Sequence, residues 1–328
     1  MKTRKIGSSN IDASIIGLGT WAIGGGDWWG DSEEESSVKT IQAAIDAGIN
    51  LIDTAPGYGF GRSEEIVGKA IRGQRSKVIL STKCGLWWQD SRGSEFFKLE
   101  DHIVKRSLDP DTIKSEVELS LKRLDTDYID IYFTHWQSIE PYFTPIKETM
   151  ACLMDLKRQG IIRAIGASNV TRENICEYIK YGELDIIQEK YSMLDRRIEQ
   201  ELVPKCIANN LSIFAYSPIE QGLLTGKIGK DYVINPKEAR AGNPWMVRDK
   251  RELVLSMLES WQDLTQKYNC TITQLVLSWT HCQQAISHIL CGARKPNHIL
   301  ETVTANEIDI SNEDIERMKN DIPELERK

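Results

Sequence analysis

Short apolar segments alternate with amphipathic helical segments along most of the chain, and this alternation constrains the fold more than any other feature. Strands are expected at 15–18, 51–54, 78–82, 129–134, 164–168, 186–189, 212–216 and 288–290. Helices are expected at 34–47, 63–72, 110–124, 145–159, 171–181, 198–209, 250–281 (two pieces, broken near Asn269) and 296–306. Strict alternation implies parallel strands with crossover helices, and eight such units favour a closed (β/α)8 TIM barrel over an open doubly wound sheet.

Two connections are too long for simple barrel loops, and a third segment precedes the barrel. The long connections, 84–109 and 217–249, follow the third and seventh strands, at the face where barrels carry functional loops. Residues 3–6 and 11–13 are expected to form an N-terminal β-hairpin. Without a low-complexity linker, we expect one domain over 1–328.

Charge and composition exclude several classes of partner. The 328 residues carry a net charge of −7 and contain no basic cluster, which argues against nucleic acid and anionic membrane surfaces. No apolar run is long enough for a signal peptide or a membrane span. Seven scattered cysteines without a Cys-x-x-Cys pair indicate reduced thiols, so we expect a cytoplasmic protein. The oligomeric state is not determined by these features.

One glycine motif imitates a dinucleotide-binding fingerprint. Residues 17–22 match G-x-G-x-x-A after a strand, but the fingerprint requires a helix to begin there. The following Ile-Gly-Gly-Gly-Asp-Trp-Trp-Gly does not favour a helix, so we interpret the segment as the loop after the first barrel strand.

Three consecutive strands end in residues that carry chemistry. With a period of two, Asp53 shares a face with Ile49 and Leu51, while Lys83 and His135 end the equivalent rows of the next two strands. Tyr58 lies in the Gly-rich loop after Asp53. Each residue alone has an ordinary structural interpretation, such as a helix cap or a solvated lysine. Together they predict one site at the carboxyl end of the barrel.

These four side chains suit proton donation to a carbonyl group. A free tyrosine has a pKa near ~10, and a neighbouring Lys83 ammonium is expected to lower the pKa of Tyr58. Asp53 would keep a buried Lys83 charged, and His135 would orient a substrate oxygen or relay a proton.

The chain resembles the aldo-keto reductases, which are NADPH-linked enzymes on this barrel, over nearly its whole length. The resemblance is carried by Asp53-Thr-Ala-x-x-Tyr58-Gly59, by Lys83 and His135, and by the segments 16–21, 120–130, 165–169, 222–227 and 292–296. It is greatest to bacterial members related to general stress reductases and to proteins encoded beside inositol-catabolism genes. The resemblance implies that Tyr58 is the general acid, tuned by Lys83 and Asp53, and that His135 positions the carbonyl.

The same resemblance implies a cofactor site for NADP(H). Its expected residues are Trp21, Ser168, Asn169, Gln188, Tyr216, Ser217, Leu223, Gly226, Lys227, Gly292, Arg294, His298 and Glu301. Tyr216 would stack on the nicotinamide ring, Lys227 would contact the pyrophosphate, and Arg294 would meet the 2′-phosphate. Arg294 also has a plainer interpretation, as an exposed cation before a helix. His298, Glu301 and Thr302 depart from the residues of many relatives, which leaves NADPH preferred over NADH without excluding NADH.

Tryptophans gather after the ends of three strands. Trp28, Trp29, Trp87, Trp88 and Trp136 are expected to line a substrate pocket, together with Trp21, for an amphipathic aldehyde or ketone such as a sugar-derived carbonyl. Packing between loops is the alternative for each of them.

The leading interpretation is an NADPH-dependent oxidoreductase that reduces aldehydes and ketones to alcohols. An alternative is a cofactor-binding regulatory or sensor subunit with little turnover. A metal-dependent hydrolase is disfavoured, because only His135 of the five histidines lies at the carboxyl end of an expected strand, and no metal is expected.

Overall fold

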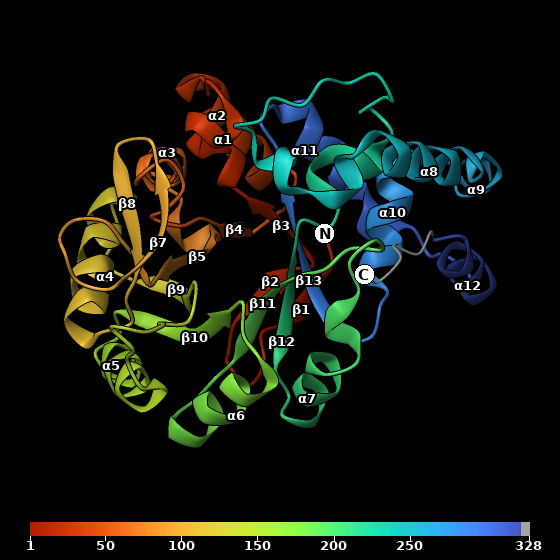
Figure 1. Ribbon diagram of the computed structural model, residues 1–328. Coiled ribbons are helices and arrows are strands. Elements are labelled where there is room, and N and C mark those ends of the chain that lie inside the picture. Colours follow the sequence, from red (N-terminus) through yellow and green to blue (C-terminus); the bar gives the residue numbers. More distant parts are fainter. Residues whose placement is uncertain (323–328) are drawn as a thin grey trace.

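The computed structural model describes residues 1–322, so the last six residues of the expected domain lie outside the described part. Eight parallel strands form a closed barrel in the order β10-β11-β12-β13-β3-β4-β5-β9 (Figure 1). They are β3 (Ile16–Gly19), β4 (Leu51–Asp53), β5 (Ile79–Cys84), β9 (Ile129–Thr134), β10 (Ile162–Ser168), β11 (Ile186–Lys190), β12 (Ser212–Tyr216) and β13 (Ile286–Gly292). The predicted (β/α)8 barrel is confirmed.

Helices surround this barrel. They are α2 (Glu34–Asp46), α3 (Arg62–Ile71), α4 (Pro110–Leu124), α5 (Ile146–Arg158), α6 (Arg172–Tyr181), α7 (Leu202–Ala208), α10 (Ile272–His281) and α11 (Pro296–Val303). Single 3-10 turns supplement them: η2 (Arg75–Lys77), η3 (Arg197–Glu199) and η7 (Thr304–Glu307). Apolar residues of strands and helices form the main core between the two layers.

The expected helix 250–281 is three helices rather than two. α8 (Arg248–Glu259) and α9 (Gln262–Lys267) precede α10, which begins after a capping box between Thr271 and Gln274. The extra break falls at Trp261, a fully buried residue whose indole donates to Asp321 over 2.9 Å. Asp321 ends α12 (Asn312–Asp321), a helix that is not predicted. Its Met318 packs into the same apolar cluster as Trp261, which is separate from the main core.

A separate apolar cluster fills the inside of the barrel, and the N-terminal hairpin covers its amino end. The predicted hairpin, β1 (Thr3–Lys5) with β2 (Asp12–Ser14), is confirmed. Ile6 and Ile11 join inward-facing residues of the barrel such as Leu51 and Phe133. Ile49, expected on the same face as Leu51, instead packs in the outer core because β4 begins only at Leu51.

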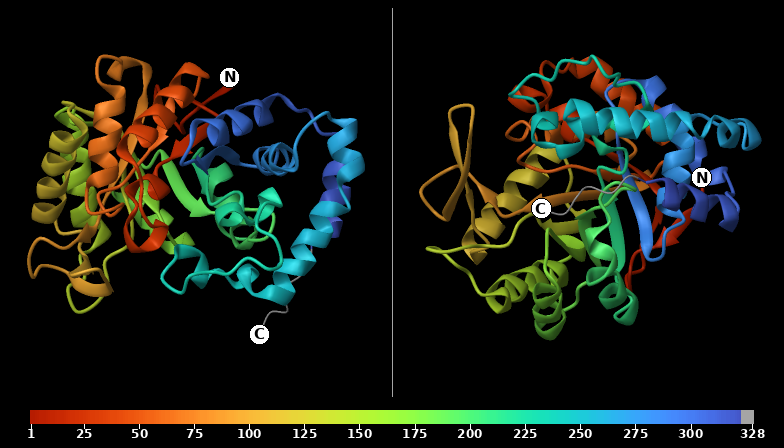
Figure 2. Two further views of the ribbon diagram at one scale, coloured as in Figure 1. Left: turned by 90° about the horizontal axis from the view of Figure 1, so that it is seen from above. Right: turned by 45° about the vertical axis from the view of Figure 1, so that its right-hand side comes forward.

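Both long connections have structure of their own. The first forms a three-stranded antiparallel sheet of β6 (Leu86–Trp87), β8 (His102–Arg106) and β7 (Ser94–Leu99). Its β7–β8 hairpin projects from the barrel (orange in Figure 2). The second carries three short helical turns, η4 (Glu220–Thr225), η5 (Ala239–Gly242) and η6 (Pro244–Met246).

The loop after β3 contains η1 (Trp21–Gly24) and the single turn α1 (Gly26–Trp29). The expectation that no helix begins here is wrong for these short turns, but no long helix of the dinucleotide-binding type is present at this place. Across residues 1–322, no helix combines the length and the apolar character needed to cross a membrane.

Candidate active site

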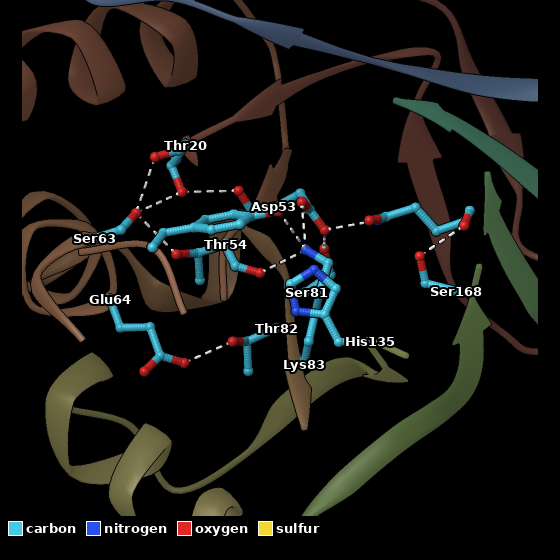
Figure 3. Close-up of polar contacts among 12 residues, drawn as sticks. Thr20, Asp53, Thr54, Ser63, Glu64, Ser81, Thr82, Lys83, His135 and Ser168 are labelled. Carbon is cyan, nitrogen blue, oxygen red and sulfur yellow. Dashed lines mark hydrogen bonds and ion pairs between the residues drawn. The ribbon is translucent and has the colours of Figure 1, made fainter. Parts of the chain in front are cut away.

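The four predicted chemical residues meet at the carboxyl end of three adjacent strands. Asp53 ends β4, Lys83 lies near the end of β5, and His135 directly follows β9, so the barrel order β4-β5-β9 brings them together. Lys83 Nζ lies 2.8 Å from Asp53 Oδ2 and 3.3 Å from the Tyr58 hydroxyl. Figure 3 shows Asp53, Lys83 and His135 converging from their strands.

Hydrogen bonds fix the orientation of the buried carboxylate and ammonium. Ser81 Oγ and Gln188 Nε2 donate to Asp53 Oδ1 over 2.7 and 2.9 Å. Lys83 Nζ also donates to the Thr54 carbonyl over 2.8 Å. Two of the three donors of the ammonium are therefore bound by Asp53 and Thr54, and the third is left for the Tyr58 hydroxyl.

The ionisation of Tyr58 differs from the prediction. Burial raises the pKa of Tyr58 well above its ordinary value, and the negative charge of Asp53 raises it further. The predicted lowering by Lys83 is wrong, because burial is the largest effect on the pKa of Tyr58 and acts in the opposite direction. Burial also lowers the pKa of Lys83, while Asp53 acts in the opposite direction. Tyr58 is thus a neutral phenol near neutral pH and retains a proton to donate.

His135 is a neutral imidazole. Its pKa lies well below the ordinary value because the ring is buried and Lys83 is close. Its Nδ1 atom is buried without a hydrogen-bond partner. A proton on Nδ1 would be a buried donor without an acceptor, so we assign the proton to Nε2. The ring meets Tyr58 edge to face, with centroids 5.9 Å apart.

A cavity of about 580 Å³ extends from these residues over the end of the barrel. Tyr58, His135 and Asp53 line it, whereas Lys83 lies buried behind them. Most of the predicted cofactor and pocket residues also line it: Trp21, Trp28, Trp29, Trp136, Ser168, Asn169, Gln188, Tyr216, Ser217, Gly292, Lys227, Arg294, His298 and Glu301.

Polar side chains form one wall of the cavity. The Tyr216 hydroxyl donates to Asn169 Oδ1 over 2.9 Å, and Asn169 Nδ2 donates to the His135 carbonyl over 2.9 Å. Ser168 Oγ donates to the Gln188 carbonyl over 2.7 Å. These contacts tie the ends of β9 to β12 into one surface that carries amide groups beside an aromatic ring.

The neighbouring wall of the cavity is formed by backbone atoms of β3 and β13. Gly19 and Gly292 are paired in register between β3 and β13, and both line the cavity. A Cβ atom at either glycine would meet no heavy atom closer than 3.7 Å, so the protein would not clash with a side chain there, and the glycines keep the wall flat. This flat surface permits the close approach that a planar ring system requires.

Trp87 and Trp88 do not line this cavity, which corrects the pocket prediction. Trp87 is buried and donates its indole N–H to Asp90 over 2.7 Å. Trp88 packs edge to face on Phe60, with centroids 5.3 Å apart. The cause is the small sheet: side chains alternate along β6, so Leu86 faces the cavity and Trp87 faces away.

Two predicted cofactor residues also lie elsewhere. The Leu223 side chain is fully buried in the core beneath η4, and Gly226 is an exposed residue with φ +71° that ends η4. Conversely, Phe96, Phe97 and Arg240 line the cavity without being predicted. The strand-like pattern of 94–99 was the available signal for the two phenylalanines.

The cations predicted to contact phosphate groups already have partners within the chain. Lys227 forms an ion pair with Glu301 at 2.7 Å. Arg294 donates from Nη1 to the Trp29 carbonyl over 2.9 Å and from Nη2 to the Asp31 carbonyl. Arg294 therefore holds the loop after β3 in place. Within residues 1–322, no group of three or more His, Cys, Asp and Glu residues is arranged to hold a metal ion.

The family model for the aldo/keto reductase family matches residues 15–321. The chain belongs to this family. It is 50% identical over the full length of both chains to the NADH-specific methylglyoxal reductase of Escherichia coli, and 39% identical to the aldo-keto reductase YhdN of Bacillus subtilis, covering 91% of this chain and 87% of that one. Among solved structures, the glycerol dehydrogenase AKR11B4 of Gluconobacter oxydans is 32% identical, with a TM-score of 0.88, covering 99% of this chain and 98% of that one. This aldo/keto reductase is thus an oxidoreductase of carbonyl compounds.

Proposed function

We propose that this aldo/keto reductase reduces small aldehydes and ketones, including 2-oxoaldehydes such as methylglyoxal, to alcohols with NADH. The observation that carries the proposal is the 3.3 Å contact between the Tyr58 hydroxyl and Lys83 Nζ at the floor of an aromatic cavity. A neutral phenol next to a buried ammonium is a general acid whose developing phenolate is stabilised as the proton leaves.

Each residue has a separate part in the chemistry. A reduced nicotinamide, when bound, supplies the hydride that reaches the carbonyl carbon. Tyr58 donates its proton to the carbonyl oxygen, and the Nε2–H of His135 holds that oxygen in place. Lys83 stabilises the phenolate, while Asp53 keeps the ammonium charged. One hydride and one proton are added, so the product is an alcohol.

The polar wall and the flat wall fit a nicotinamide. Ser168, Asn169 and Gln188 would hold its carboxamide, and the Tyr216 ring would stack on one face. Gly19 and Gly292 leave room on the same side of the cavity. Tyr58 and His135 line the same cavity and would contact the carbonyl group of the substrate.

Two observations favour NADH over the NADPH that the sequence predicts. Lys227 is neutralised by Glu301, and Arg294 donates to backbone carbonyls, so neither cation is free for a 2′-phosphate. The relative from E. coli is named NADH-specific, which supports the same choice.

Steady-state oxidation of NADH and NADPH with methylglyoxal tests the proposal in the wild type and in Tyr58→Phe. We expect turnover with NADH and a loss of about 100-fold or more in kcat for the variant, whose ring retains the packing. Equal turnover in Tyr58→Phe would remove Tyr58 from the chemistry. Cofactor binding without turnover of any carbonyl would instead support a regulatory subunit.

A further inference from the structure

Arg106, the last residue of β8, lies beside the aromatic wall of the cavity. Its guanidinium carbon is 3.7 Å from the centroid of the Phe96 ring and 4.7 Å from that of Trp136. Both rings line the cavity, and they pack against each other with centroids 5.3 Å apart. Trp136 directly follows His135, so the cation lies next to the wall that begins at the reacting groups.

The guanidinium has no counter-charge within the described chain. Its Nε atom is buried without an acceptor, and no carboxylate of residues 1–322 forms an ion pair with it. Burial lowers the pKa of Arg106, and no neighbouring charge opposes this effect. The side chain is half-buried, and its two terminal nitrogens, unlike Nε, are not buried. One edge of the planar fork therefore remains open to a ligand.

Arg106 lies outside the lining of the cavity, against two of its rings, and the cations closer to the site differ from it. Lys83 is paired with Asp53, Lys227 with Glu301, and Arg240 with Glu238 at 3.2 Å. Arg294 is bound to two carbonyl groups. Stacking on aromatic rings provides part of the stabilisation of Arg106, but it leaves the hydrogen-bond donors unused.

We propose that Arg106 binds the anionic group, a carboxylate or a phosphate, of carbonyl substrates long enough to extend past Phe96 and Trp136. The inference rests on the proposed function, because it places the carbonyl end of such a substrate at Tyr58 and His135. The planar fork of arginine matches the paired oxygens of a carboxylate or a phosphate. The rings beneath it contact the carbon chain between the two ends.

Two matched pairs of substrates test this subsite: 4-oxobutanoate against butanal, and glyceraldehyde 3-phosphate against glyceraldehyde. For each pair, the ratio of kcat/KM for the anionic over the neutral substrate is measured in wild type, Arg106→Gln and Arg172→Gln. Arg172 is an exposed arginine on α6, so its variant controls for the change in net charge. We expect Arg106→Gln to lower at least one ratio about tenfold or more, because a bidentate charged contact is lost.

A fall in the carboxylate pair alone or in the phosphate pair alone supports the inference and identifies the anion. Ratios that stay unchanged in both pairs overturn it, and this includes a variant whose kcat/KM falls equally for neutral and anionic substrates. If the wild type reduces none of the four carbonyls, turnover of methylglyoxal decides the proposed function separately. The subsite is then tested by titrating tryptophan fluorescence with 4-hydroxybutanoate and glycerol 3-phosphate: saturable quenching that Arg106→Gln abolishes supports it, and no saturable quenching in the wild type overturns it.

Discussion

Lys83 and Asp53 form an ion pair of 2.8 Å in which both side chains are withdrawn from solvent. Buried ion pairs contribute little net stability, because the desolvation of two charges offsets their attraction. This pair is completed by hydrogen bonds from Ser81 and Gln188 to the carboxylate, so its geometry is fixed from three strands, β4, β5 and β11. Its value lies in presenting a positive charge to the Tyr58 hydroxyl.

Lys83→Met removes that charge while keeping much of the side-chain volume. We expect kcat to fall by about 100-fold or more, because the phenolate is no longer stabilised. The unfolding free energy should fall by about 3–5 kcal/mol, since Asp53 remains buried without its partner. Steady-state kinetics and urea unfolding measure the two effects.

The double variant Lys83→Met/Asp53→Asn separates chemistry from folding. Removing the unpaired carboxylate should recover most of the lost stability, because a neutral amide can keep the hydrogen bond from Ser81. Activity should remain low, since the ammonium is still missing. Recovery of activity along with stability would show that Lys83 acts only through folding.

The buried carboxyl of Glu189 on β11 should make the folded protein less stable as the pH rises toward 7. Burial raises the pKa of its carboxyl from 4.5 to about 7, although it accepts a hydrogen bond from the Val170 amide. Between pH 4.5 and 7 the folded chain binds more protons here than the unfolded chain, so this contribution to stability is lost as the pH rises through 7. In Glu189→Gln the loss is absent.

We therefore expect Glu189→Gln to gain stability relative to wild type by roughly 3 kcal/mol between pH 4 and pH 8. Urea midpoints of both proteins across that range measure the difference. A difference between variant and wild type that stays constant with pH would mean that Glu189 does not titrate on folding in this window.

Gly24 packs directly against the backbone of Tyr58, so a larger residue at this position should displace the catalytic tyrosine. A Cβ atom at this position would lie 2.6 Å from the backbone carbon of Tyr58, so alanine must displace the turn that carries the phenol. We expect Gly24→Ala to lower kcat by about tenfold or more, because small errors in the position of an acid are costly. Gly229→Ala is the matched control, since its Cβ would meet nothing within 4 Å. Equal kcat in both variants would contradict the prediction.

The sequence predicted the centre of the site because parallel strands impose it. Carboxyl ends of neighbouring barrel strands meet at one face, so a period-two pattern was enough to bring Asp53, Lys83 and His135 together. The pKa of Tyr58 could not be predicted in the same way. It depends on how deeply the phenol is buried, which is a property of the surrounding loops.

The walls of the cavity were harder to predict than its floor. The faces of Trp87 and Phe96 are set by antiparallel pairing within the inserted sheet, where β7 and β8 change register between Glu95 and Phe97. Arg294 shows the same limit. Its sequence neighbours indicate a cation before a helix, whereas its hydrogen-bond partners Trp29 and Asp31 come from the opposite end of the chain.

Arg294 and Glu301 together predict how the choice of cofactor can be changed. If Arg294 holds the loop after β3, Arg294→Ala should raise KM for NADH and NADPH by similar factors, because both cofactors lose the same wall. Glu301→Gln should instead lower KM for NADPH several-fold and leave NADH nearly unchanged, since it frees Lys227 and removes a negative charge. Initial rates with each cofactor at saturating methylglyoxal measure both variants. A loss confined to NADPH in Arg294→Ala would restore the 2′-phosphate role that the sequence predicts, and the preference for NADH would then need another cause.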